Sequence, residues 1–147
     1  MKFNTKTRYG IRTMMEIAMQ DPQQGIFQKD IATRQRISFK YLDQIIASLK
    51  AADLINNVRG KKSGYVITRP ASQITIYDIH KAFAPEINIV DCLSEMVDCE
   101  EIGHCAPRDL WKGLNEKIVE YLRNYTLQDL VDRQLQYKKK LNSQSSS

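Results

Sequence analysis

The spacing of hydrophobic residues changes part-way along the segment between residues 28 and 69. One run has apolar residues at i, i+3, i+4, i+7 and i+10, the spacing of one buried helix face, namely Leu42, Ile45, Ile46, Leu49 and Ala52. After Leu54 the period shortens, and the runs 55–58 and 65–68 read as two short strands around a glycine-bounded loop. The segment therefore predicts two helices joined by a tight turn, followed by a hairpin.

The second of these helices has the features of a helix that reads DNA bases. The first helix is expected over residues 29–35, the chain turns at Arg36 and Ile37, and Ser38 precedes the next run as an N-cap. The outward positions of the second helix are Lys40, Asp43, Gln44, Ala47 and Lys50. A recognition helix contacts base edges with side chains near its N-terminus. Major-groove contacts are therefore predicted from Ser38, Lys40, Tyr41 and Gln44.

The loop between the two predicted strands is strongly basic and reads Arg-Gly-Lys-Lys-Ser-Gly over residues 59–64. A helical pair followed by a hairpin with a cationic tip is typical of a winged helix-turn-helix, in which the hairpin is the wing. The same helical pair also occurs as plain packing, and a basic hairpin is often only solvated, but the combination favours DNA binding. Contacts to the minor groove or the phosphate backbone are expected from Arg59, Lys61 and Lys62.

The N-terminal segment predicts a further helix with a basic surface. This helix is expected over residues 5–20, with Thr5 or Thr7 as its cap. Four basic residues precede its first acidic residue, Glu16, and they are Lys2, Lys6, Arg8 and Arg12. Such a surface is either simply solvated or lies beside a phosphate backbone.

Three more helices are predicted in the C-terminal half. A short one opens with Thr75 and Asp78 as a capping box. Pro107 takes a favoured first-turn position of a long helix whose apolar stripe is Leu110, Trp111, Leu114, Ile118, Tyr121, Leu122 and Tyr125. A stripe this broad either packs into the core or forms a dimer interface. Thr126 with Asp129 marks the last helix, and its inward residues are expected to be Leu127, Leu130, Val131 and Leu135.

These elements predict a mainly α fold with a small β-hairpin wing and a long dimerisation helix, in one domain or in one domain with a short appendage. Residues 1–84 are expected to form the winged helix-turn-helix DNA-binding domain, 85–106 a cysteine-containing loop, and 107–137 the dimerisation helices. Residues 138–147, three lysines followed by a serine-rich stretch, are expected to be disordered.

The charge distribution supports a nucleic-acid partner. Residues 1–70 hold 13 Lys and Arg against 5 Asp and Glu, a net charge of +8, whereas residues 71–147 hold 9 against 12, a net charge of −3. The positive half contains the helix-turn-helix, as a surface that faces phosphates should. RNA or an acidic protein could also bind such a surface, but RNA-binding proteins usually present aromatic side chains on a sheet for base stacking. Duplex DNA is therefore favoured.

Several classes of protein are disfavoured by composition. No apolar run approaches about 18 residues and the N-terminus lacks a hydrophobic signal core, so a cytoplasmic location is expected. The chain has 2 histidines, no nucleophile elbow and no phosphate-binding glycine loop. An enzyme is therefore not expected.

All three cysteines lie in one short segment, at Cys92, Cys99 and Cys105. An odd number of cysteines without a secretion signal argues against a disulfide framework. Three thiolates on a loop suit a soft metal centre, either zinc or an iron–sulfur cluster. The spacings are wider than those of zinc knuckles and favour a cluster. Thiols without a metal are the other possibility.

Several stretches resemble the Rrf-type family of bacterial regulators, which includes IscR, NsrR and RirA. The matching residues are 6–10 (Lys-Thr-Arg-Tyr-Gly), Ser38 with Tyr41-Leu42, the wing over 58–65, the three cysteines, Leu110-Trp111, Thr126-Leu127 and Leu130-Val131. The resemblance implies a homodimeric winged-helix transcription regulator of operator DNA, expected to be a repressor. It also implies that Cys92, Cys99 and Cys105 hold an iron–sulfur cluster, of 2Fe–2S or 4Fe–4S type, that senses iron, redox state or nitric oxide.

The chain departs from the resemblance at the fourth cluster ligand. Some members use a histidine just after the third cysteine, where this chain has Arg108, and others a carboxylate of the partner chain at the position of Arg8. His104, Glu101, Asp98 or an exogenous ligand would have to substitute. Some members lack a cluster and respond to a partner protein. Regulation by such a partner or by cysteine thiol oxidation is therefore the alternative.

Overall fold

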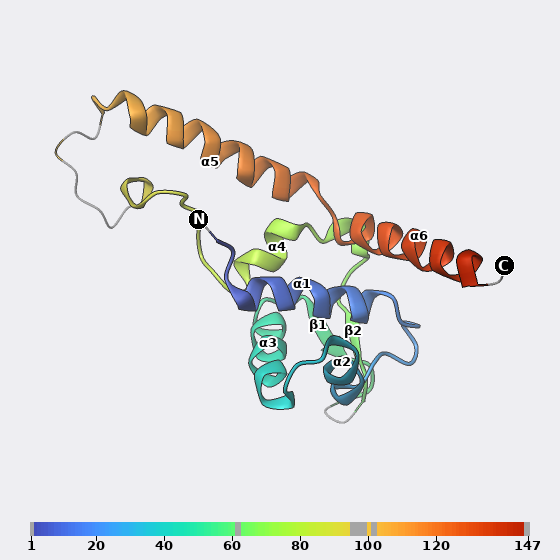
Figure 1. Cartoon of the computed structure of the whole chain (residues 1–147). Coiled ribbons are helices and arrows are strands. Elements are labelled where there is room, and N and C mark those ends of the chain that lie inside the picture. The colour runs from blue at the N-terminus through green and yellow to red at the C-terminus, as the bar shows by residue number, and fades with distance from the viewer. Residues whose placement is uncertain (1, 61–62, 95–99, 101–102, 146–147) are drawn as a thin grey trace.

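The computed structural model describes residues 2–60, 63–94, 100 and 103–145, and Figure 1 shows a helical body with a small hairpin. Lys61, Lys62 and Cys99 therefore lie outside the described residues. The helices and strands, including two short 3-10 helices η1 and η2, are α1 (Thr5–Ala18), α2 (Gln28–Gln35), α3 (Phe39–Ala51), β1 (Ile55–Asn57), β2 (Tyr65–Ile67), η1 (Ala71–Gln73), α4 (Ile76–Lys81), η2 (Asp91–Leu93), α5 (Ala106–Asn124) and α6 (Leu127–Ser145).

Helix α1 lies at the centre of the body, against α2, α3, α4, α6 and β2 (Figure 1). Its cap is Asn4, whose side chain accepts a hydrogen bond from the Thr7 backbone N–H at 2.6 Å. The prediction of Thr5 or Thr7 as the cap was wrong, because Thr7 lies inside the first turn and is buried. The helix also ends at Ala18, earlier than predicted.

The helix-turn-helix follows the predicted plan. Arg36 ends α2 with a left-handed backbone, φ 54°, and the Ile37 N–H donates to the Ala32 carbonyl at 3.1 Å, which closes the turn. Four residues of the predicted stripe on α3 are buried, namely Leu42, Ile45, Ile46 and Leu49. The fifth, Ala52, is exposed, because α3 ends at Ala51 and Ala52 lies in the turn that leads to β1.

The wing is a two-stranded antiparallel hairpin with Ile55 opposite Ile67, and each strand ends one residue sooner than predicted. Ile26 pairs with Tyr65 through two backbone hydrogen bonds of 3.1 and 2.8 Å, which ties the wing to the segment before α2. Gly64 permits this approach, because a Cβ there would lie 2.7 Å from the Gln24 carbonyl oxygen. The wing is thus fixed relative to the helix-turn-helix.

The C-terminal helices begin as predicted. Thr75 and Asp78 form a capping box on α4, and Thr126 and Asp129 make the same reciprocal hydrogen bonds at the start of α6. Helix α6 packs on α1 and η1, and its buried residues are Leu127 and Val131. The first turns of α6 are therefore also part of the winged-helix core, beyond the role given to residues 107–137.

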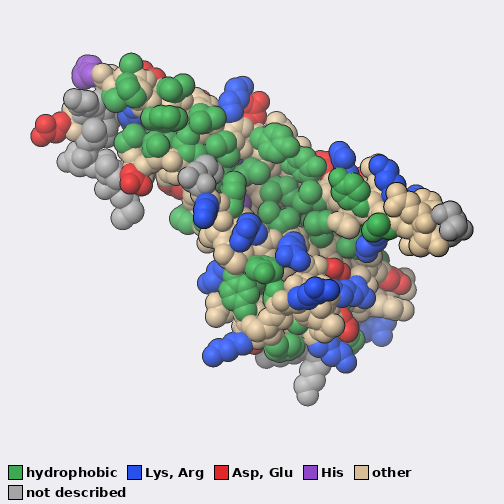
Figure 2. All heavy atoms as spheres, in the orientation of Figure 1, with side chains coloured by type: hydrophobic (Ala, Val, Ile, Leu, Met, Phe, Trp, Pro, Cys, Tyr) green, Lys and Arg blue, Asp and Glu red, His purple; other side chains and the backbone are tan. Residues whose placement is uncertain are grey.

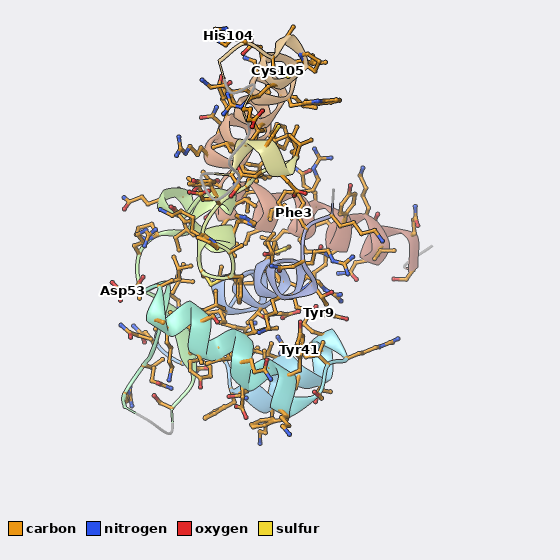
Figure 3. All side chains as sticks on the ribbon, turned by 90° about the vertical axis from the view of Figure 1, so that its left-hand side faces the viewer. Phe3, Tyr9, Tyr41, Asp53, His104 and Cys105 are labelled. Atoms are coloured by element: carbon orange, nitrogen blue, oxygen red, sulfur yellow. The ribbon has the colours of Figure 1, made fainter. Side chains whose placement is uncertain are left out.

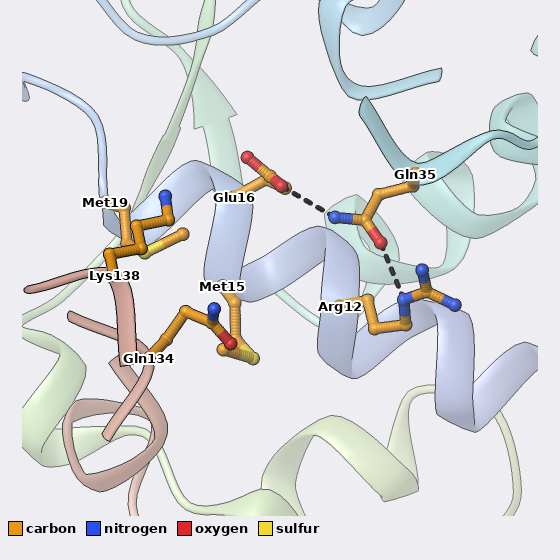
Figure 4. A pocket seen from close by; sticks show the side chains of 7 residues that line it. All are labelled: Arg12, Met15, Glu16, Met19, Gln35, Gln134 and Lys138. Carbon is orange, nitrogen blue, oxygen red and sulfur yellow. Dashed lines mark hydrogen bonds between the residues drawn. The ribbon is translucent and has the colours of Figure 1, made fainter. Parts of the chain in front are cut away.

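Two expectations for α6 differ from the structure. Leu135 was predicted to face inward but is 44% exposed, because at this level Gln134 and Lys138 are the residues of α6 that lie beside Met15 and Met19 of α1 (Figure 4). The predicted disordered tail, residues 138–147, is helical as far as Ser145. Lys, Gln and Leu in this stretch are good helix formers and continue a helix already anchored at its N-terminus. Among the described residues, no helix is long and apolar enough to cross a membrane.

Replacing Gly10 by Ala should destabilise the fold. A Cβ at Gly10 would overlap the ring of Phe83, which packs beside α1. Helix propensity favours Ala over Gly by about 1 kcal/mol, but overpacking costs about 1–3 kcal/mol, so a net loss in the free energy of unfolding is expected in urea titration. The matched control is Gly113→Ala in α5, where nothing lies within 4 Å of a new Cβ. Equal stability of the two variants would contradict the proposed packing.

Candidate nucleic-acid interface and cysteine segment

The N-terminal turns of α3 present the predicted base-reading side chains. Ser38 caps the helix, because its Oγ accepts a hydrogen bond from the Tyr41 N–H at 3.1 Å. Lys40 and Gln44 are exposed, and Tyr41 is half-buried. The serine hydroxyl can still donate its own proton outward. The Lys40 ammonium group and the Gln44 amide are therefore available for contacts in a DNA groove. Tyr41 is half-buried and less free to move than these two side chains.

Two further residues of the helix-turn-helix hold α3 in place. Gln28 of α2 donates from its side-chain amide to the Asp43 carboxylate and also contacts the Phe39 carbonyl at 3.4 Å. The Tyr41 ring meets the Tyr9 ring of α1 edge-to-face, with centroids 5.8 Å apart, and Figure 3 shows the two labelled side chains together. The sequence interpretation missed Tyr9 and Gln28, since only the fold brings three helices to one place.

The wing is connected to α3 by a chain of polar contacts. Lys50 donates to the Asn57 side chain at 2.9 Å and lies over the Tyr65 ring at 4.9 Å, and Asn57 donates to the Ser63 carbonyl at 3.0 Å. Burial raises the pKa of Tyr65, so its phenol stays neutral at physiological pH. Arg59 is exposed, and its backbone N–H donates to the Ser63 hydroxyl at 2.7 Å. Arg59 thus contributes its backbone N–H to the turn, and its exposed side chain is available for contacts outside the turn.

The two described cysteines lie at the far end of α5 from the helix-turn-helix. Cys92 is in η2, Cys105 directly precedes α5, and both are half-buried free thiols. Arg108 links these segments by donating from Nε to the Cys92 carbonyl at 3.4 Å. Figure 3 shows Cys105 and His104 remote from Tyr41. His104 is exposed, as expected for a residue on the loop.

No set of three or more His, Cys, Asp or Glu side chains close enough to hold a metal occurs within the described part of the chain. Cys99, Asp98 and Glu101 lie outside that part. The three-cysteine ligand set therefore stays a prediction, of which the structure places two members.

One side of α5 is apolar and uncovered in the protomer. Leu110, Leu114 and Tyr121 are 64%, 47% and 65% exposed. Figure 2 shows hydrophobic side chains gathered along this helix. Another side of α5 contacts the segment before η2, because the Asn115 side chain donates to the Ile87 carbonyl at 2.8 Å and accepts from the Ile89 N–H at 3.0 Å. The stripe predicted from sequence is divided: Leu122 and Tyr125 pack against the core of this chain, whereas Leu110, Leu114 and Tyr121 are exposed.

The family assignment follows from a match over most of this architecture. The Rrf2 family model, described as an iron-dependent transcriptional regulator, matches residues 3–133. The chain belongs to the Rrf2 family. The resemblance drawn from the sequence and the winged-helix fold are both confirmed, and this Rrf2 member is a DNA-binding transcription regulator rather than an enzyme.

Similar proteins of the Rrf2 family include two kinds of named regulator. IscR of Serratia proteamaculans, an HTH-type transcriptional regulator, is 31% identical over 134 residues, which cover 91% of this chain and 81% of IscR. CymR of B. subtilis, described as a global cysteine regulator, has a solved structure with 32% identity and a TM-score of 0.75, over 90% of this chain and 98% of CymR. The oxidized form of Staphylococcus aureus CymR has 32% identity and a TM-score of 0.72, over 89% of this chain and 96% of that CymR chain.

Proposed function

We propose that this Rrf2 regulator binds operator DNA as a homodimer, acts as a repressor, and changes its DNA affinity with the state of the cysteine segment. The observation that carries the proposal is the pairing of an exposed recognition-helix N-terminus and wing with an uncovered apolar face on α5. A dimer built on α5 would present two recognition helices to two half-sites about one helical turn apart.

Base reading and backbone contact are assigned to different residues of this interface. Gln44 is suited to a bidentate contact with adenine, and Ser38, Lys40 and Tyr41 lie beside it on α3. Arg59 of the wing, together with Lys61 and Lys62 on the sequence argument alone, is assigned to the backbone or minor groove. The two roles have different signatures in binding experiments, because only base contacts depend on sequence.

Gln44→Ala and Arg59→Gln should therefore weaken DNA binding in different ways. With a duplex selected in vitro against the wild-type protein, Gln44→Ala should cost about 1–3 kcal/mol and relax discrimination at one base position. Arg59→Gln should weaken binding to selected and scrambled duplexes alike, and should reduce the salt slope by about one unit per protomer. Fluorescence anisotropy across a salt series measures both, and wild-type behaviour of both variants would contradict this interface.

An iron–sulfur cluster is our first candidate for the sensing group. Cys92, Cys99 and Cys105 would hold it, and a bound cluster would supply a labile, redox-active centre that responds to iron, oxygen or nitric oxide. The described residues fit this use: two free thiols lie at one end of α5, half-exposed, with the Arg108 guanidinium joining their segments. His104, beside Cys105, is the described candidate for a fourth ligand.

Thiol oxidation without a metal is the second candidate. Support comes from Staphylococcus aureus CymR, which is 32% identical to this chain and has an oxidized form among its solved structures. The half-buried free thiols of Cys92 and Cys105 are open to the same kind of chemistry. The cluster and the thiol hypotheses share the same residues and differ in whether iron is needed.

Either signal would reach DNA through α5. Cys105 is the residue before α5, and Arg108 in its first turn bonds to the Cys92 segment. The same helix contacts α4 of the winged domain and carries the exposed apolar face. A change in the cysteine segment would alter the position of α5 and therefore the spacing of two recognition helices, provided that the signal favours one arrangement.

A further inference from the structure

We propose that Phe39, the first residue of α3, packs against the 5-methyl group of a thymine in the major groove and so specifies one base of the operator. This inference rests on the proposed DNA-binding function and adds to it an apolar specificity-determining residue beside the polar contacts assigned to Lys40 and Gln44. The observation that carries it is a large aromatic side chain that is 52% exposed at the start of the recognition helix.

The ring of Phe39 has no packing role within the protomer. Among the described residues, Phe39 belongs neither to the hydrophobic core nor to the side chains packed against it. Within the same residues its ring meets no other aromatic or cationic side chain. The start of α3 is already set by the Ser38 cap, and phenylalanine is a poorer helix former than alanine. The exposed ring is therefore available for a contact outside the protomer.

The backbone at Phe39 is held in place by the first helix of the pair and by the wing. The Gln28 amide contacts the Phe39 carbonyl at 3.4 Å and donates to the Asp43 carboxylate one turn further along α3. The Tyr65 hydroxyl of β2 donates to the side-chain oxygen of Gln28 at 3.5 Å. The first turn of α3 is thus tied to both α2 and the wing. A contact residue that is held before binding loses less conformational entropy when it binds.

The position of Phe39 places its ring beside the side chains assigned to base reading. Phe39 with Asp43 and Lys40 with Gln44 form two adjacent i, i+4 rows on α3, and all four residues are exposed. Side chains lean toward the N-terminus of a helix, so a ring on the first residue extends beyond the first turn. Figure 1 shows this turn at the end of the body away from α5 and α6. A recognition helix contacts base edges with this end.

The chemistry of the ring selects thymine as its contact in the groove. A phenyl ring has no hydrogen-bonding group for a base edge and no charge for a phosphate. The thymine 5-methyl group is the apolar feature in the major-groove pattern of the bases, and phenylalanine is among the side chains that contact it. Cytosine presents an amino donor on its major-groove edge instead. Phe39 therefore adds discrimination that Lys40 and Gln44, which act through hydrogen bonds, do not supply.

The test replaces each thymine in one half-site of the in vitro selected duplex by deoxyuridine, one at a time, because uracil lacks only the methyl group. Anisotropy with the full chain at fixed salt should show about 4-fold weaker binding at one thymine, the effect of losing one buried methyl-sized group. Phe39→Ala should bind the thymine and uracil duplexes equally at that position. The matched control is Phe27→Ala, which removes a ring of similar exposure, 48%, just before α2 and should keep the 4-fold difference.

Three results would overturn the assignment. The wild type could bind every uracil duplex as tightly as the parent duplex. A sensitive thymine that stays sensitive in Phe39→Ala would be read by another residue or through DNA shape. Conversion of Phe39→Ala to monomers in sedimentation velocity would make the ring a contact between two copies of the chain.

Gln44→Ala and Arg59→Gln separate this inference from the function on which it rests. If both variants bind selected and scrambled duplexes as the wild type does, the proposed DNA interface itself has failed. If both respond as expected and no uracil duplex distinguishes Phe39→Ala from the wild type, only the thymine contact of Phe39 is rejected.

Discussion

Replacing Leu114 by Asp should prevent the proposed dimer from forming and weaken binding to a selected operator roughly 10²–10⁴-fold, the range over which linked sites gain avidity. Leu114 is 47% exposed between Leu110 and Tyr121 on the uncovered side of α5. In a dimer across this face, the substitution would bury two carboxylates without partners. Leu114 is preferred to Ile118 for this test, because Ile118 is already half-buried in the protomer and its loss would also disturb the fold.

Sedimentation velocity and operator anisotropy measure the two parts of this prediction. Lys112→Gln is the control, since it changes the net charge by the same amount at an exposed position two residues away, which a helix places on a different side. Circular dichroism should show both variants equally folded. A Leu114→Asp protein that sediments as a dimer would place the interface on another surface.

Replacing any one cysteine should abolish the sensing response. In anaerobically purified protein, Cys92→Ala, Cys99→Ala and Cys105→Ala should each remove the visible absorption of an iron–sulfur cluster. Each should also shift operator affinity in the direction produced by iron chelation of the wild type, by roughly 5–150-fold, the usual range of coupling between two sites. The physical reason is that thiolates are the ligands that hold such clusters, and the loss of one opens the iron to exchange. Equal operator affinity of cluster-loaded and cluster-free dimers at matched salt would disprove the coupling.

Two controls separate the ligand and thiol hypotheses. His104→Ala should change the spectrum only if this exposed residue supplies a fourth ligand. If the anaerobic wild type has no visible absorption, the cluster hypothesis is wrong for this chain. Peroxide should then change the operator affinity of the wild type and leave that of the cysteine variants unchanged, as expected for a thiol switch.

The sequence by itself determined the local elements and much of the interface. The period of Leu42, Ile45, Ile46 and Leu49 specified α3, and Ser38 specified its start, because helix periodicity and capping depend on residues within one or two turns. The capping boxes before α4 and α6 were equally local. The outward residues Lys40 and Gln44 followed from the same period.

Longer-range features were decided only by the tertiary structure. Ala52 fits the stripe of α3, yet the helix ends one residue before it, and Leu135 fits the stripe of α6, yet it is 44% exposed. Tyr9, Arg12 and Gln35 contact neighbours 32, 23 and 19 residues away, on other helices. A periodic pattern says which face of a helix is apolar, but what covers that face depends on packing between segments distant in the chain. On α5, Leu122 and Tyr125 of the apolar stripe pack against the core, whereas Leu110, Trp111, Leu114 and Tyr121 stay exposed.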